Sequence, residues 1–176
     1  MSLSDEIRSS IRTIPDFPKP GIQFRDITPL LSDTNLSAKV AKALAEPFMD
    51  MQIDVVAGIE SRGFLYGVLI AQHLGCGFSM IRKKGKLPYR TVEQSYALEY
   101  GEATIEMHID AIQTGQRVLI HDDLLATGGT AEATANLIRK MDGEVAGFNF
   151  VVELDDLDGR SRIQPYTDKI VSIVNY

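Results

Sequence analysis

The sequence predicts an α/β fold with a central, mostly parallel sheet flanked by helices. Short apolar segments rich in β-branched residues alternate with segments of helical periodicity, which is the pattern of parallel strands joined by crossover helices. The length of 176 residues is enough for one globular domain with a sizeable core, and hardly for two. Hydrophobic residues make up 44% of the chain and charged residues 24%, which excludes a disordered protein. We therefore predict a single domain over residues 1–176.

Strands and helices are predicted in turn from local patterns. Ser32 or Asp33 can cap a helix in which apolar residues recur every four positions from Leu36 to Phe48, and Pro47 should kink or end it. Further strands are predicted over 53–59, 78–81, 117–120, 145–154 and 170–174, and further helices over 63–74 and 130–141. For the helix over 63–74, the expected buried face consists of Phe64, Leu65, Val68 and Leu69.

Two segments depart from this alternation. Residues 14–29 contain four prolines and cannot form a continuous helix, so we expect an ordered loop or hood, and Phe17, Ile22 and Phe24 suggest that it packs on something. Residues 103–109 alternate between apolar and polar side chains, which predicts a half-exposed antiparallel strand. That strand would belong to a hairpin inserted after Ile81.

The net charge and the single cysteine restrict the classes of function. With 18 Lys and Arg against 24 Asp and Glu, the formal charge is −6, which argues against a general binder of nucleic acid or of anionic membranes. No apolar run approaches the roughly 20 residues of a membrane span, and the polar N-terminus is unlike a signal peptide. Cys76 is the only cysteine, so an intramolecular disulfide is impossible. We expect a cytoplasmic protein with no nucleic-acid and no membrane partner.

The most informative segment is VLIHDDLLATGGT, which runs from Val118 to Thr130. An apolar strand ends in Asp122 and Asp123, and a Thr-Gly-Gly-Thr turn then opens a helix. In an open α/β sheet, ligands bind at the carboxyl ends of the strands. Gly128 allows the backbone to approach an anion, and the N–H groups at the helix start point towards it. The carboxylates suit the hydroxyls of a sugar next to a phosphate, or a hydrated Mg²⁺, whereas either half of the motif alone would be an ordinary acidic strand end or glycine turn.

This segment resembles the 5-phosphoribosyl-1-pyrophosphate (PRPP) signature of the type I phosphoribosyltransferase family, and its DDLLATGGT wording is similar to the adenine-specific members. Three other segments resemble the family in the same order along most of the chain. They are FPKPGIQFRDITPLL at 17–31 (the hood), GIESRGF at 58–64 (the pyrophosphate loop), and RKKGKLP at 82–88 with YALEYG at 96–101 (the flexible catalytic loop). The resemblance implies a type I phosphoribosyltransferase fold, with an N-terminal hood over residues 1–34 and a flexible hairpin lid over residues 82–108.

The resemblance also implies an activity. This activity is the Mg²⁺-dependent transfer of 5-phosphoribose from PRPP to N9 of adenine, which gives AMP and pyrophosphate in purine salvage. The metal is expected to be held by PRPP and water, with no direct ligand from a protein side chain. A homodimer is implied as well, in which a residue such as Arg82 reaches the partner's site.

By resemblance, each part of PRPP has its own residues. The 5′-phosphate is expected at Ala126, Thr127, Gly128, Gly129 and Thr130, and the ribose hydroxyls at Asp122 and Asp123. The pyrophosphate is expected at Glu60, Ser61, Arg62, Lys83 and Lys86, with a non-proline cis peptide between Glu60 and Ser61. Five basic residues and no acidic one occur over 82–90, which suits a mobile lid over a polyphosphate, although such runs are usually solvated faces. For Arg62 the alternative is a surface ion pair at a strand end.

The reacting groups follow from the same resemblance. The expected catalytic residues are Glu99, Tyr100, Arg62 and Lys83. Glu99 would manage the purine proton as N9 bonds to the sugar, and Tyr100 would close over the ribose or the pyrophosphate. The alternative for Glu99 is a solvated loop carboxylate.

Adenine is expected at Gln23, Phe24, Arg25 and Leu124. Phe24 and Leu124 would clamp the flat ring from either side. Backbone groups around Gln23 and Arg25 would recognise the 6-amino group. Simple core packing is an equal alternative for Phe24.

Two other functions stay open at this point. A 6-oxopurine or pyrimidine phosphoribosyltransferase would use the same PRPP site, but Ala126 and the FRDITPLL hood argue against it. A non-catalytic PRPP-binding regulator would share the fold, but it normally carries a basic DNA-binding extension. His121 departs from the aliphatic residue usual before the two aspartates. On a strand it points opposite to Asp122, and we predict that it is hydrogen-bonded at the sheet edge or against a helix.

Overall fold

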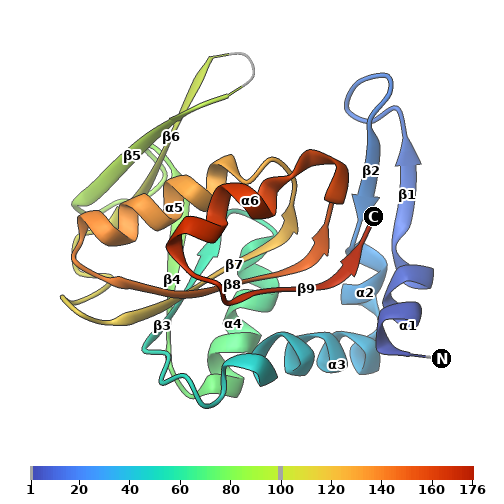
Figure 1. Cartoon of the computed structure of the whole chain (residues 1–176), viewed down its shortest axis with the longest axis horizontal. Helices are drawn as coiled ribbons and strands as arrows, with labels where there is room; N and C mark the ends of the chain where they lie inside the picture. Colours follow the sequence, from blue (N-terminus) through green and yellow to red (C-terminus); the bar gives the residue numbers. More distant parts are fainter. Residues whose placement is uncertain (1, 99–100) are drawn as a thin grey trace.

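The computed structural model describes residues 2–98 and 101–176, and in this part of the chain a seven-stranded sheet forms the centre (Figure 1). The strands are ordered β5-β6-β4-β3-β7-β8-β9. Neighbours from β4 to β9 are parallel, whereas β6 is antiparallel to both β4 and β5. The bounds are β3 Val55–Ile59, β4 Gly77–Lys83, β5 Thr91–Ala97, β6 Glu102–His108, β7 Arg117–Leu125, β8 Glu144–Glu153 and β9 Ile170–Asn175. The predicted α/β class with a mostly parallel sheet is therefore confirmed.

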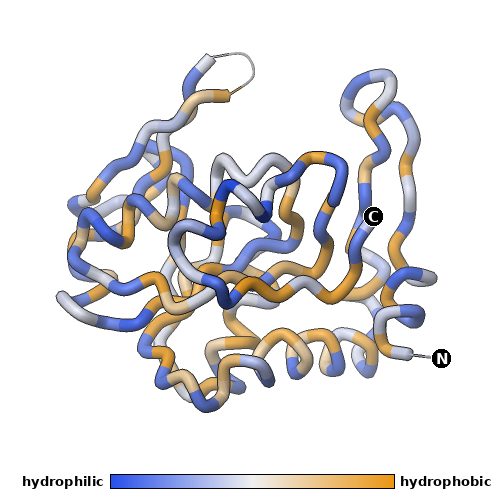
Figure 2. The backbone as a smooth tube through the Cα atoms, in the orientation of Figure 1, coloured by the Kyte–Doolittle hydropathy of each residue, from blue (hydrophilic) through white to orange (hydrophobic). Residues whose placement is uncertain are grey.

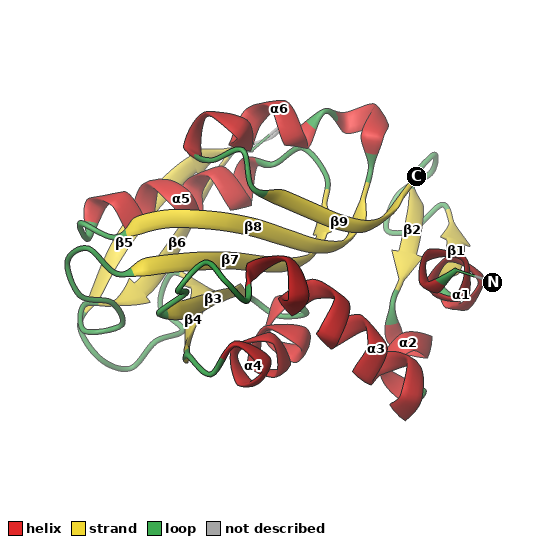
Figure 3. Ribbon diagram, turned by 60° about the horizontal axis from the view of Figure 1, so that its bottom comes forward, coloured by secondary structure: helices red, strands yellow, loops and turns green. Residues whose placement is uncertain are grey.

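Helices cover both faces of the sheet (Figure 3). α3 (Thr34–Ala45) and α4 (Gly63–Leu74) pack on one face, and α5 (Gly129–Lys140) with α6 (Gly159–Ile163) lies over the other. Short 3₁₀ turns occupy Glu46–Phe48, Asp155–Leu157 and Gln164–Tyr166. Alternate residues of β7 enter the two cores, Leu119 on the α3–α4 side and Ile120 on the α5 side. Figure 2 shows the apolar residues running through the central strands and α4. None of the helices described is long and apolar enough to span a membrane.

The buried face of α4 differs from the prediction. The helix has the expected bounds, but its buried residues are Gly63, Tyr66, Gly67, Ile70 and Ala71, while Leu65 is 46% and Val68 41% exposed. A Cβ atom added to Gly67 would lie 2.7 Å from the ring of Phe78 on β4. The helix thus approaches the sheet through glycine, and large apolar side chains are left on its outer side. Counting apolar residues selects the wrong face because glycine carries no hydropathy signal for such contacts.

The N-terminal segment forms a hairpin instead of a loop. α1 (Leu3–Ser10) leads into the antiparallel strands β1 (Arg12–Pro15) and β2 (Gln23–Asp26), and α2 (Thr28–Ser32) follows. Phe17 is 50% and Ile22 44% exposed, so the predicted packing is wrong for Ile22, while Phe17 packs on Phe24 of the same hairpin. Both side chains are exposed because they lie at the hairpin tip, which extends away from the sheet (Figure 1). Phe24 is half-buried, with the Phe17 ring edge-on to it at 5.2 Å.

The second hairpin, β5–β6, extends from the other side of the sheet (Figure 1). Its antiparallel pairing confirms the predicted insertion after β4. The predicted half-exposed alternation is wrong in the middle of β6, where Ile105, Glu106 and Met107 are all at most 3% exposed. Glu106 can be buried because its carboxylate accepts hydrogen bonds from the N–H groups of Lys86 and Leu87, at 2.9 and 2.8 Å.

His121 lies in the middle of the sheet, because β7 pairs with β3 on one side and β8 on the other. The predicted hydrogen-bonded role holds. Of the two predicted places, the sheet edge is wrong and the helix side is right, since His121 shares a face of β7 with Leu119 on the α3–α4 side. The imidazole is fully buried, and its Nδ1–H donates to the backbone and side-chain oxygens of Asn149 at 3.1 and 2.9 Å. Asn149 in turn donates to the Leu44 carbonyl of α3 at 2.9 Å. Burial lowers the pKa of His121 to about 4.

This depressed pKa makes the stability depend on pH. The unfolded chain takes up the proton near pH 6.5, well above the folded-state value, so stability is complete above pH 6.5 and is lost as the pH falls towards 4. Between pH 6.5 and 5 the loss should be about 2 kcal/mol. We expect His121→Val to remove this part of the pH dependence. Denaturant unfolding of both proteins across this range measures the difference, and parallel curves would contradict the assignment.

Candidate functional site

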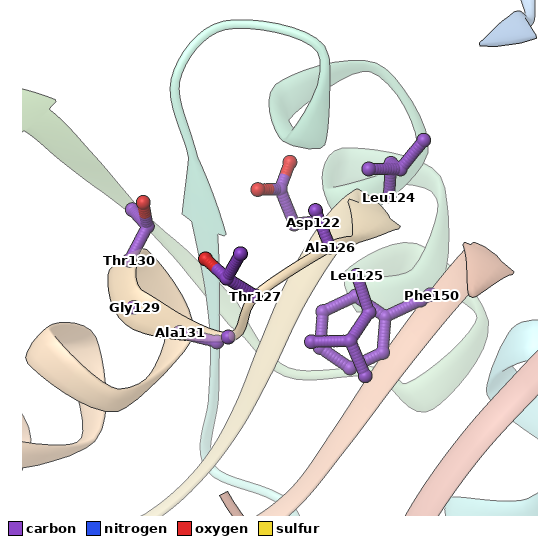
Figure 4. A pocket seen from close by; sticks show the side chains of 10 residues that line it. Asp122, Leu124, Leu125, Ala126, Thr127, Gly129, Thr130, Ala131 and Phe150 are labelled. Atoms are coloured by element: carbon purple, nitrogen blue, oxygen red, sulfur yellow. The ribbon is translucent and has the colours of Figure 1, made fainter. Parts of the chain in front are cut away.

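The loops that follow β3, β4 and β7 meet at one edge of the sheet, as expected for the carboxyl ends of parallel strands. A cavity of about 90 Å³ lies at the end of β7. Figure 4 shows Asp122, Thr127 and Thr130 among the side chains that line this cavity. Further lining residues are Leu124, Leu125, Ala126, Gly128, Gly129, Ala131 and Phe150. The structure thus brings together all five residues predicted for the 5′-phosphate with one predicted for the ribose.

The turn between β7 and α5 is suited to an anion. Gly128 has φ +77°, a conformation that favours glycine, and α5 begins at Gly129, one residue earlier than predicted. The first N–H groups of this 12-residue helix have no partner within the helix and carry the positive end of its dipole. The Thr130 hydroxyl lies 3.0 Å from the hydroxyl of Tyr96 on β5.

A close backbone contact holds this turn in place. A Cβ atom on Gly128 would lie 2.7 Å from the Gly159 carbonyl oxygen, and one on Gly159 would lie 2.1 Å from the Ala126 carbonyl oxygen. The start of α6 is therefore the floor on which the turn rests. Sequence analysis missed Gly159; the only signal is a glycine after an acidic turn, in a segment far from the motif.

The two predicted ribose carboxylates differ in surroundings. Asp122 is half-buried and lines the cavity, whereas Asp123 is 4% exposed and lies 3.0 Å from Nε of Arg62. Burial and the neighbouring Asp123 charge raise the pKa of Asp122 well above its usual range. Burial also raises the pKa of Asp123, partly offset by the Arg62 guanidinium. Among the described residues, Asp123 therefore has a direct ion pair with a cation, whereas Asp122 has none and feels the same Arg62 charge only from a distance.

Arg62 contacts both the end of β7 and the hood, two regions that are far apart in the sequence. Besides its ion pair with Asp123, its guanidinium carbon lies 4.9 Å from the ring centroid of Phe24 in the hood. The alternative of a surface ion pair is excluded, because its carboxylate partner is buried. The peptide between Glu60 and Ser61 is cis, as predicted.

A second cavity, of about 110 Å³, lies between β3, β4 and the phosphate turn. Its lining includes Glu60, Lys83, Asp122 and Thr130. It therefore places two residues predicted for pyrophosphate beside residues predicted for the ribose and the 5′-phosphate. Ser61, Arg62 and Lys86 do not line this cavity.

The side chains predicted for adenine divide between two sides of the hood. Phe24 faces Arg62, whereas Gln23 and Arg25, its neighbours on β2, line another cavity of about 340 Å³ with Tyr176. This follows from the alternation of side chains along a strand. Leu124 lines the cavity at the end of β7. The side chains of Gln23 and Arg25 are thus not gathered with Phe24, while the prediction for their backbone groups stays a prediction.

The predicted catalytic residues Glu99 and Tyr100 lie outside the described residues. Earlier in the same YALEYG segment, Tyr96 and Leu98 line a space of about 500 Å³ together with Thr127, Thr130 and Arg162. Sequence analysis missed Arg162, and it included Tyr96 in the YALEYG segment without a role of its own, because both positions depend on contacts between distant segments. Within 2–98 and 101–176, no group of three or more His, Cys, Asp or Glu side chains could hold a metal ion.

Comparison with known proteins gives a consistent result. The phosphoribosyl transferase domain family matches residues 27–175. The adenine phosphoribosyltransferase of Cytophaga hutchinsonii is 53% identical over 99% of this chain and 96% of its own length. The crystal structure of adenine phosphoribosyltransferase from Rhodothermus marinus has a TM-score of 0.92 and 52% identity, covering 99% of this chain and 98% of that one. The Saccharomyces cerevisiae enzyme, crystallised with D-2,5-dideoxy-2,5-imino-altritol 1,6-bisphosphate and adenine, has a TM-score of 0.89 and 36% identity, covering 97% and 98%.

These similarities extend over nearly the whole chain, and they include the hood, the β7–α5 turn and the β5–β6 hairpin. Sequence, fold and local geometry therefore agree that the chain belongs to the adenine phosphoribosyltransferase family of type I phosphoribosyltransferases.

Proposed function

We propose that this protein transfers 5-phosphoribose from PRPP to N9 of adenine, with AMP and pyrophosphate as products. The observation that carries the proposal is the position of Asp122. This carboxylate lines both the cavity of the phosphate turn and the cavity that contains Glu60 and Lys83. A sugar held by Asp122 would thus have an anion site on each side, as PRPP requires. The relatives named for this activity, and the adenine bound in the Saccharomyces cerevisiae structure, support the same reaction.

The chain's own residues would act mainly by positioning and by charge stabilisation. The N–H groups at the start of α5, with Thr127 and Thr130, would hold the 5′-phosphate. Asp122 and Asp123 would accept hydrogen bonds from the ribose hydroxyls. Bond making at N9 and loss of pyrophosphate would pass through a cation-like sugar, whose leaving group needs positive charge and whose carbon must be kept from water.

The positive charge would come from Lys83 and Arg62. Lys83 already lines the cavity beside Glu60. Arg62 is held by Asp123 and Phe24 in the described structure, so it would serve the pyrophosphate by exchanging part of this contact. Ser61 and Lys86 are proposed as weaker pyrophosphate contacts. Glu99, for the purine proton, and Tyr100, for closure of the lid, are proposed on the resemblance of the YALEYG segment alone.

Adenine is proposed to bind between Phe24 and Leu124. The ring of Phe24 contacts Arg62, which pairs with Asp123 of the site, and Leu124 lines the phosphate cavity. An apolar pair of this kind accepts a flat base from both sides. Recognition of the 6-amino group is assigned to backbone groups near Gln23 and Arg25.

Mg²⁺ is the proposed cofactor. This ion usually keeps several waters and binds through one or two carboxylates together with substrate phosphates. The residues present fit an ion held by PRPP and water, because the half-buried Asp122 carboxylate could accept hydrogen bonds from the water ligands of the ion. When bound with PRPP, the metal would neutralise charge on the leaving pyrophosphate.

A homodimer and a cytoplasmic location are also proposed, with residues 1–34 as the hood and 82–108 as the lid of one domain. Exposed Leu65 and Val68 on α4 support self-association, since they leave an apolar strip on the outer side of that helix. Arg82 remains proposed as a residue that serves the partner's site, although it pairs with Glu60 of its own chain at 3.0 Å. We expect a mass of twice 19.4 kDa in sedimentation equilibrium, and Leu65→Glu to shift it towards 19.4 kDa; a monomeric wild type would refute the dimer.

The activity is tested with a panel of bases. We expect AMP from adenine and labelled PRPP, and little or no nucleotide from hypoxanthine, guanine or xanthine. Asp122→Asn with Asp123→Asn should lower turnover at least about 100-fold, because both acceptors of the ribose hydroxyls lose their negative charge next to the cation-like sugar, while the unfolding midpoint stays within a few degrees. Nucleotide from a 6-oxopurine would favour the other enzyme class, and tight PRPP binding without any product would favour the regulator.

The floor of the phosphate turn gives a separate prediction. In Gly159→Ala the new Cβ must displace the Ala126 carbonyl, so we expect the KM for PRPP to rise about tenfold, which is about 1.4 kcal/mol, while the KM for adenine changes little. Gly77→Ala is the matched control, because a Cβ there meets no atom closer than 3.6 Å. An unchanged KM for PRPP in the folded Gly159 variant would show that α6 does not support the turn.

A further inference from the structure

Glu106 is a buried carboxylate with an unusual set of partners. Its side chain is on β6, 3% of the residue is exposed, and none of the salt bridges found among the described residues includes it. Instead, Oε1 accepts hydrogen bonds from the N–H groups of Lys86 and Leu87, at 2.9 and 2.8 Å, and Oε2 accepts one from the Thr91 hydroxyl at 3.3 Å. Burial opposes ionisation, but these donors hold the pKa of the Glu106 carboxyl below its usual value.

The segment that Glu106 holds is a tight turn that begins at Lys83. The Lys86 N–H also points to the Lys83 carbonyl, at 3.3 Å, and Gly85 has φ +83°. The Lys84 N–H donates to the Thr104 carbonyl of β6 at 3.0 Å. Glu106 therefore binds the end of the turn, at Lys86 and Leu87, from β6, the strand that also pairs with Lys83 at the start of the turn.

A second carboxylate holds the other side of the same segment. Oε2 of Glu60 lies 3.0 Å from Nε of Arg82 and accepts the Lys83 N–H at 2.9 Å. Arg82 in turn donates to the Lys86 carbonyl at 3.2 Å, which joins the start of the turn to its end. The Lys83 backbone is thus held through its N–H by Glu60 and through its carbonyl by the turn that Glu106 binds, and Lys83 lines the cavity next to Asp122.

We propose that Glu106 is a positioning residue for the pyrophosphate end of the substrate: by fixing the turn over 83–87, it presents the Lys83 ammonium to the cavity before the ligand arrives. This inference rests on the proposed function. Burial of a carboxylate costs free energy unless hydrogen bonds satisfy its oxygens. Here those hydrogen bonds order the turn over 83–87 in the free protein, so the conformational entropy of this turn is not lost again when the ligand binds. Glu106 itself does not touch the substrate.

The test is a kinetic comparison of Glu106→Ala, Glu106→Gln and the wild type. In the alanine variant we expect the KM for PRPP to rise about tenfold, with the KM for adenine within twofold. The glutamine variant should stay within threefold for both, because its amide oxygen can accept the two N–H groups and its NH₂ can donate to Thr91. Glu46→Ala is the matched control, since it removes an exposed carboxylate far from this turn.

Three outcomes overturn the proposal: an unchanged KM for PRPP in Glu106→Ala, an equal rise of both KM values, or failure of the glutamine variant to restore binding. If the alanine variant does not fold, hydrogen exchange of the wild type decides. The Lys86 and Leu87 amides must then be protected before pyrophosphate is added, and fast exchange in the free protein refutes the preformed turn.

Calorimetric titration with magnesium pyrophosphate, without adenine, separates this proposal from the proposed reaction. A wild type that binds pyrophosphate but forms no AMP would refute the reaction, while weaker pyrophosphate binding by Glu106→Ala would still support positioning. A wild type that forms AMP, together with a Glu106→Ala variant of unchanged pyrophosphate affinity, would refute positioning alone.

Discussion

The arrangement of the site depends on carboxylates kept largely out of water at the carboxyl ends of the strands. Asp123 and Glu106 are at most 4% exposed, and each has a different kind of partner. Asp123 pairs with a guanidinium that also contacts the hood, and Glu106 accepts hydrogen bonds from backbone N–H groups of the turn over 83–87, called the basic turn below. Since a buried charge without partners is very costly, each carboxylate dictates where its partner segment must lie. The hood, the phosphate turn and the basic turn are thereby positioned relative to one another by electrostatics as much as by apolar packing.

Close backbone approach is the second constraint, and it acts where no side chain could. Gly67 lets α4 lie against Phe78, and Gly159 lets α6 support the turn at Ala126. The first contact sets the distance between the helix layer and the sheet; the second sets the depth of the phosphate cavity. Gly67 and Gly159 themselves lie outside the motifs that the sequence assigns to the substrate, so the shape of the site also depends on how the surrounding helices pack.

Much of this was predictable from the sequence, for identifiable reasons. The spacing of apolar residues, together with the glycines and prolines between segments, predicted the bounds of α4 to the residue and those of the parallel strands to within a few residues, because each of these signals is local. The β7–α5 motif could be read because strand, carboxylates and glycine turn follow one another directly. The partners of Glu106 and Arg62, and the role of Gly159, could not be predicted, because they depend on which distant segments meet. His121 shows the same limit: its buried side follows from strand alternation, whereas its partner Asn149 lies on β8.

The net charge of −6 illustrates how little a sum says about a site. Five of the 18 basic residues lie over 82–90, so the rest of the chain carries 13 against 24 acidic residues, or −11. Even this basic segment is not uniformly free: Arg82 pairs with Glu60, and Lys84 with Glu93, at 3.0 and 2.8 Å. Those pairs fasten the segment to Glu60, which follows β3, and to β5, while Lys83 between them lines a cavity. The acidic neighbours therefore do not merely cancel the cations. They hold Arg82 and Lys84, whereas Lys83, Lys86 and Arg90 have no ion pair among the described residues and stay available to an anion, in a protein whose overall charge would repel it.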